Sequence, residues 1–275
     1  MGSSEFVLCF LCYIYFVSTN ALSAAAITTN LKTRFVGQRI LYYPSVPSTM
    51  EVARQEVQKG TPEGTVIIAS EQTAGRGRMQ RSWLTPEGNV AVSVVLYPEL
   101  AQLPSMIMLA SLAVVHCIRA VAGLDPGIKW PNDIMINGRK VSGILIESDV
   151  RQEKVQSTVI GVGLNVSLHP TDYPDIRDIA TSLSQESGRD VSAVDSVRTL
   201  LVETERLYTE LAAGRSLYDE WRDNMVTLGK AVRVLSGKNV YEGIAESVAP
   251  DGSLILRDDK GNHIKIVAGD VTLRS

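Results

Sequence analysis

The sequence predicts an α+β protein in which a mixed, largely antiparallel sheet with helices is followed by a small C-terminal β-barrel. In the first part of the chain, a hairpin signal lies among segments whose apolar residues have helical spacing, which argues against a doubly wound parallel sheet. After Gly229, short strand-like runs are separated by turns such as Pro250-Asp251-Gly252. We therefore expect one large domain over residues 36–226 and a small β-barrel over residues 229–275.

The composition is that of a folded protein with a substantial core. The chain has 275 residues, of which 45% are hydrophobic and 21% charged, and its net charge is −3. These values exclude a largely disordered chain and argue against nucleic acid as the main partner, because phosphate backbones are bound by basic surfaces. Basic residues nevertheless gather locally, which indicates a small anionic ligand; they are Arg76, Arg78, Arg81, Arg139 and Lys140.

Residues 1–30 are interpreted as a leader. An apolar run from Phe6 to Val17 is followed by small residues, as in a targeting segment, although Glu5 precedes it and the first basic residue is Lys32. The alternative is a leader without a targeting role. The run is too short for a standard membrane span, so we expect no stable membrane association of the mature chain, which would lie in the cytoplasm or the plastid stroma. Without Cys9 and Cys12, the mature chain keeps one cysteine and cannot form an internal disulfide.

Local signals place the elements of the large domain in order. Ser48-x-x-Glu51 is a capping-box pattern that starts a helix, which Gly60 ends. Asn137-Gly138 is a strong signal for a hairpin turn, and Ser192 caps a long helix that ends at Gly214. The remaining segments are strands at 65–70, 89–97, 133–136, 141–147 and 155–166, and a helix from Pro104 to about Ala122.

The loop over residues 75–83 carries the first chemical signal. Gly75 and Gly77 allow the backbone to approach a ligand closely, and exposed backbone amides can cradle an oxyanion. Arg76, Arg78 and Arg81 add fixed positive charge and bidentate donors. A solvated basic loop or a minor RNA contact explains the same spacing equally well. The loop alone therefore does not decide the function.

A second segment contains Lys129-Trp130-Pro131-Asn132-Asp133, followed by Arg139-Lys140 and Gly143. Taken alone, Pro-Asn-Asp is typical of a turn, and Lys140 is a common kind of solvated lysine. The presence of both segments in one chain gives them weight.

Four motifs in order resemble those of biotin protein ligases, also called holocarboxylase synthetases. They are GRGR-x-x-R-x-W from Gly75 to Trp83, KWPND from Lys129, RK-x-x-GIL from Arg139, and G-x-G-x-N from Gly161 to Asn165. The resemblance extends from about Tyr43 to the C-terminus. It implies the class II synthetase-like catalytic domain of the biotin and lipoyl ligases, with an SH3-like terminal barrel.

The resemblance implies an ATP-dependent ligase. Such an enzyme forms biotinyl-5'-AMP from biotin and ATP with Mg²⁺, then transfers biotin to a lysine in the biotin carboxyl carrier domain of acetyl-CoA carboxylase or a related carboxylase. A lipoate-type acyltransferase of the same fold and a non-catalytic biotin-binding module are the alternatives. Some bacterial members also carry a DNA-binding domain; here the residues before the motifs are apolar or small, so we expect a monofunctional ligase that binds no nucleic acid. The sequence leaves open whether the chain forms a homodimer.

The resemblance also assigns roles to individual residues. Lys140, Arg78 and Arg76 match catalytic positions, and Asp133 matches the metal end of the site. Met50 departs from the bacterial pattern, which has Asn after Ser-Thr. No general base is identified, since His116 and His169 are more typical of structural histidines. The matched biotin-binding positions are Ser48, Thr49, Met50, Gln72, Arg76, Gly77, Arg78, Lys140 and Gly143. The matched nucleotide-binding positions are Gly75, Arg78, Arg81, Trp83, Asn132, Asp133, Asn165 and Arg274.

Overall fold

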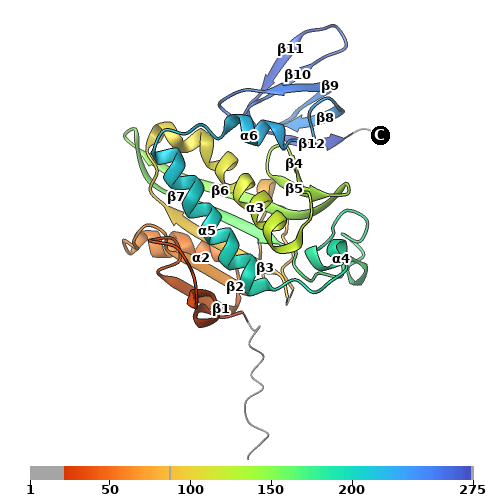
Figure 1. The fold of residues 1–275 in the computed structure, drawn as a ribbon. Coiled ribbons are helices and arrows are strands. Elements are labelled where there is room, and N and C mark those ends of the chain that lie inside the picture. The colour runs from red at the N-terminus through yellow and green to blue at the C-terminus, as the bar shows by residue number, and fades with distance from the viewer. Residues whose placement is uncertain (1–21, 87, 274–275) are drawn as a thin grey trace, which may run out of the picture.

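The structure is a computed structural model that describes residues 22–86 and 88–273. A seven-stranded sheet with its helices forms the body of the protein, and a five-stranded sheet follows it toward the C-terminus (Figure 1). The apolar run from Phe6 to Val17, with Cys9 and Cys12, lies outside the described residues, as does Arg274.

The large sheet has the order β1-β2-β3-β7-β6-β5-β4. Only the β1–β2 pair is parallel, and every other pair is antiparallel, so the prediction of a mixed, largely antiparallel sheet is confirmed. The strands are β1 (Ile40–Val46), β2 (Val66–Gln72), β3 (Val90–Leu96), β4 (Gly127–Lys129), β5 (Asp133–Ile136), β6 (Arg139–Arg151) and β7 (Lys154–Leu164).

The two faces of this sheet pack against different helices. Ile68 and Val94 belong to the main core with α3 (Met106–Ala122) and α5 (Ala193–Ala212), which pack against each other. The neighbouring Ile67 and Val95 belong to a smaller core with α2 (Thr49–Gln58), because successive strand residues face opposite sides. The segment Leu100–Ala122 is long and apolar enough to cross a membrane, but most of it is buried inside this core.

The start of α2 differs from the capping box expected from the sequence. Ser48 is the N-cap residue, but its side chain makes no capping hydrogen bond. Instead, the Thr49 amide donates to the Gln72 side-chain oxygen at 2.9 Å. A residue distant in sequence therefore takes the role predicted for a local pair. By contrast, Ser192 caps α5 as expected, accepting from the Asp195 amide.

A short N-terminal helix belongs to the large domain. Helix α1 (Ala24–Thr28) is capped by Ser23, and its Ile27 is fully buried. The Glu205 carboxylate on α5 accepts the backbone N–H groups of residues 34, 35 and 36 at 2.7–2.9 Å. Helix α1, which belongs to the segment assigned to the leader, also packs against α5, and a truncation at residue 30 would remove it.

The C-terminal part forms an antiparallel five-stranded sheet with the order β11-β10-β9-β8-β12. The backbone N–H of Trp130 donates to Thr227, and its indole N–H donates to the carbonyl of Gly252, so Trp130 joins the two parts. The strands of this C-terminal sheet are β8 (Ala231–Ser236), β9 (Asn239–Val248), β10 (Leu254–Arg257), β11 (His263–Ile266) and β12 (Asp270–Leu273). Sequence analysis missed β12 and the short helices α4 (Leu183–Ser187) and α6 (Tyr218–Asp223).

Candidate active site

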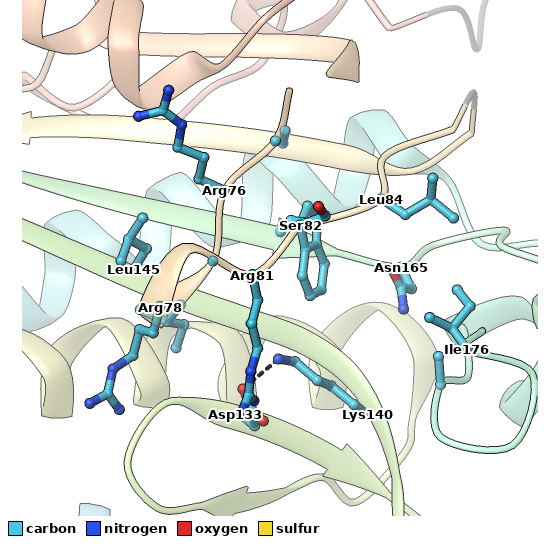
Figure 2. A pocket seen from close by; sticks show the side chains of 18 of the residues that line it. Arg76, Arg78, Arg81, Ser82, Leu84, Asp133, Lys140, Leu145, Asn165 and Ile176 are labelled. Atoms are coloured by element: carbon cyan, nitrogen blue, oxygen red, sulfur yellow. Dashed lines mark ion pairs between the residues drawn. The ribbon is translucent and has the colours of Figure 1, made fainter. Parts of the chain in front are cut away.

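A cavity of about 840 Å³ lies where the arginine loop (residues 75–83) meets β3, β5, β6 and β7. Figure 2 shows the side chains of the arginine loop and of the β5–β6 hairpin approaching one another across it. Of the residues proposed from the sequence, the cavity is lined by Thr49, Met50, Gln72, Gly75, Arg76, Gly77, Arg78, Arg81, Trp83, Asn132, Asp133, Lys140, Gly143 and Asn165. Ser48 is buried at the start of α2 and is not part of this lining.

One end of the cavity is polar and is held by a network that spans three elements. The Gln72 side-chain oxygen accepts both the amide and the hydroxyl of Thr49, at 2.9 and 3.2 Å. The Ser93 hydroxyl on β3 donates to the Thr49 hydroxyl at 2.8 Å, and the Gln72 amide nitrogen donates to Thr85 at 3.2 Å. Sequence analysis missed Ser93 and Thr85, since a lone hydroxyl carries no signal until its partners are known.

Glycines make the floor of the cavity flat. A Cβ on Gly163 would lie 2.2 Å from the Trp83 ring, and one on Gly143 would lie 2.9 Å from it. A Cβ on Gly161 would lie 2.6 Å from the sulfur of Met50. The glycines therefore let Trp83 and the buried Met50 lie directly on the sheet. Met50 offers an apolar surface at the position where the bacterial pattern has Asn.

Charged groups gather at the other end of the cavity. The Lys140 ammonium lies 2.6 Å from an Asp133 carboxylate oxygen and 5.2 Å from the centre of the Trp83 ring, within cation–π range. Arg78 donates to the Asn132 side-chain oxygen at 3.2 Å. Burial lowers the pKa of Arg78, and the Asp270 and Asp133 carboxylates oppose that shift. The Arg78 guanidinium is therefore a partly desolvated cation.

The other two arginines of the loop are placed differently. Arg81 forms an ion pair with Asp270 at the start of β12, so the C-terminal part reaches the site. Arg76 is exposed, and its guanidinium points away from Asp133 and Lys140 (Figure 2). The catalytic role expected for the Arg76 side chain therefore has no support from this geometry, and only its backbone takes part in the loop hairpin, through a bridge to Ser82.

A segment absent from the sequence-based site forms another wall. Residues 173–176 and 178–180 line the cavity, and this run is called the wall segment below. It joins β7 to α4, and the Asn165 side chain supports its end by donating to the carbonyl of Thr181 at 3.0 Å. Its composition, with Pro174 and two aspartates, indicates a loop but not a ligand site. Only the fold brings it beside Lys140, through a bridge between Lys140 and Ala180.

The described residues contain no group of three or more His, Cys, Asp or Glu side chains arranged around a metal. Mg²⁺ does not require one, because it keeps several waters and is held by one or two carboxylates together with substrate phosphates. Asp133 fits that demand. His116 lies elsewhere, between the carboxylates of Glu203 and Glu220 at 3.0 and 2.7 Å. His169 precedes the 3-10 turn Pro170–Asp172.

Known proteins share this combination of domains. Residues 42–165 match the model of the biotin/lipoate A/B protein ligase family, and residues 227–274 match that of the biotin protein ligase C terminal domain. The bifunctional ligase/repressor BirA of Bacillus subtilis (strain 168) is 37% identical over 258 residues, which cover 92% of this chain and 79% of BirA. The chain belongs to the biotin protein ligase family.

Other members agree with this assignment. The biotin–[acetyl-CoA-carboxylase] ligase of Paracoccus denitrificans is 32% identical over 207 residues, which cover 72% of this chain and 86% of that protein. The structure of the biotin protein ligase from Aquifex aeolicus in complex with biotin and ATP is 26% identical and superposes with a TM-score of 0.72, covering 86% of this chain and 99% of the other. The fold expected from the sequence, including the SH3-like terminal domain, is thereby confirmed.

Proposed function

We propose that this chain forms biotinyl-5'-AMP from biotin and ATP in the cavity and then transfers biotin to a carrier lysine. The observation that carries this proposal is the polarity of the cavity. Thr49 and Gln72 supply neutral hydrogen-bonding groups to the lining, and Lys140 and Arg78 supply cations. Met50 and Trp83 lie over the glycine floor and add apolar surface. Biotin has groups that match these, with a polar ureido ring, an apolar chain and a carboxylate.

In this arrangement the ends of biotin are bound differently. We assign the hydrogen bonds to the ureido ring to Thr49 and Gln72, which both line the cavity. Met50 and Trp83 cover the apolar part of the ligand, and Gly143 leaves room for it. The carboxylate then points to Lys140, whose charge Asp133 balances at 2.6 Å in the structure described here.

Adenylation joins two anions, and the protein lowers the barrier by neutralising them. A biotin carboxylate oxygen attacks the α-phosphorus of ATP, an O–P bond forms, and the bond to pyrophosphate breaks. Lys140 and Arg78, which both line the cavity, stabilise the charge that gathers on the phosphoryl oxygens. Asp133, together with the phosphates, would hold Mg²⁺, which would supply further neutralisation. Arg81, Asn132, Asn165 and Arg274 are the proposed contacts on the nucleotide side.

Transfer follows because the mixed anhydride is a good acyl donor. The amine of the carrier lysine attacks the acyl carbon, an amide bond forms, and AMP leaves with the electrons of the anhydride bond. We assign the carrier to the biotin carboxyl carrier domain of acetyl-CoA carboxylase or a related carboxylase. We further propose that the ligase is monofunctional, which its net charge of −3 supports, and that it acts in the cytoplasm or the plastid stroma.

Incubation with radiolabelled biotin, ATP and a panel of carrier domains tests the proposal. One carrier should gain label at a single lysine, and a carrier with that lysine changed to arginine should gain none. Labelling of a lipoyl carrier with lipoate, but of no carrier with biotin, would favour the lipoate alternative and overturn the proposal.

A further inference from the structure

Glu186 lies on α4 outside the cavity, yet it joins the two segments that enclose the Lys140 backbone. One segment is the turn of the β5–β6 hairpin, which leads directly into Lys140. The other is Thr181, which directly follows the wall segment. Both contribute hydrogen-bond donors to the Glu186 carboxylate, which is 5% exposed.

Both oxygens of the Glu186 carboxylate accept hydrogen bonds. One of its oxygens accepts the Thr181 hydroxyl at 2.5 Å and the Arg139 guanidinium at 2.6 Å. The other accepts the Asn137 side-chain amide at 2.7 Å. Burial works to raise the pKa of Glu186, but these donors outweigh it and leave the pKa lowered, so the group is a carboxylate at neutral pH.

The Lys140 backbone is held from the same side. Its N–H donates to the carbonyl of Ile179 at 2.8 Å, and its carbonyl accepts the N–H of Thr181 at 2.9 Å. Thr181 therefore bonds Lys140 through its backbone and Glu186 through its hydroxyl. Arg139, the residue before Lys140, bonds the same carboxylate oxygen as that hydroxyl.

We propose that Glu186 is a positioning residue that fixes the wall segment to the Lys140 backbone and so keeps the adenylate site closed. This inference rests on the proposed function, because the closed site is the one that holds biotinyl-AMP. The Lys140 side chain contacts Asp133 and Trp83, so a shift of its backbone moves the cation relative to both. Glu186 touches no substrate in this account.

The substitution Glu186→Gln tests it, because it keeps the size of the side chain and removes the charge. Biotinyl-AMP formed on the enzyme should dissociate about tenfold faster than from the wild type, measured per loaded molecule so that inactive protein does not count. The amides of residues 140 and 181 should also exchange with deuterium faster. Thr181→Val should show both effects, and Thr181→Ser, which keeps the hydroxyl, should show neither.

The control is Glu56→Gln near the end of α2. The Glu56 side chain is also largely buried, and its carboxylate pairs with Arg39 and Lys59 at 2.9 and 2.8 Å. This substitution should leave adenylate dissociation and exchange at residues 140 and 181 unchanged. Unchanged dissociation and exchange in Glu186→Gln, or equal changes in Glu56→Gln, would overturn the inference. If Glu186→Gln does not fold, Thr181→Val alone decides it. Absence of adenylate from the wild type would contradict the proposed function instead, and the exchange measurement would still test the positioning role.

Discussion

Arg78→Gly is the substitution that should change the fate of the adenylate most. The Arg78 guanidinium lines the cavity from a half-buried position, donates to Asn132 at 3.2 Å and lies within electrostatic reach of Asp133. We expect it to contact the adenylate phosphate. Loss of one charge-assisted hydrogen bond costs about 1.5–3 kcal/mol. Glycine also gives the loop more conformational freedom. Since each ~1.4 kcal/mol is tenfold in affinity, biotinyl-AMP should escape roughly ten to a hundred times more readily.

Escaped biotinyl-AMP acylates nearby amines, which gives a direct assay. The variant is incubated with biotin, ATP and serum albumin, and albumin is then probed for biotin. Arg76→Gly is the matched comparison, because it makes the same backbone change in the same loop but removes a guanidinium that points away from Asp133 and Lys140. Strong labelling by the Arg78 variant and weaker labelling by the Arg76 variant are expected. Unlabelled albumin, with adenylate still formed, would refute the retention role of Arg78.

Three further outcomes are expected. Lys140→Ala should keep the fold, because the partly exposed ion pair between Lys140 and Asp133 contributes only about 0–1 kcal/mol to stability. The substitution should slow adenylation at least about tenfold. A wild-type rate of pyrophosphate exchange would contradict the role of Lys140 in adenylation. Removal of residues 1–21 should leave activity and melting temperature unchanged. Removal of residues 1–30 should lower the melting temperature, because it deletes the buried Ile27. Equal melting temperatures of the two truncated proteins would show that α1 contributes nothing to stability. Burial raises the pKa of Cys117 to about 12, so the thiol stays neutral at pH 8 and should react with a thiol reagent only after unfolding; rapid modification of the native protein would contradict its burial.

Elements with strong local signals were predictable from the sequence. The Asn137-Gly138 turn, the Ser192 cap and the apolar strands all lie where their residues indicated. Elements defined by distant partners were not. Strand β1 was not among the expected strands, since its pairing with β2 depends on residues more than twenty positions away. Helix α1 was hidden by the leader pattern before it.

The candidate site follows the same division. Motif residues such as Asn132, Lys140 and Trp83 do come together in the cavity. The partners that hold them, including Ser93 and Glu186, had no sequence signal because each acts through contacts made only in the fold. Arg76 shows the converse limit, since its spacing matched a motif but its side chain points away from the charged end of the cavity.

Biotin adenylation by this chain can be measured without any carrier, as biotin-dependent exchange of labelled pyrophosphate into ATP. The chain should catalyse exchange with biotin, and the rate should fall to background when biotin is omitted or replaced by lipoate. Exchange that lipoate stimulates and biotin does not, or no exchange by well-folded protein, would contradict the account.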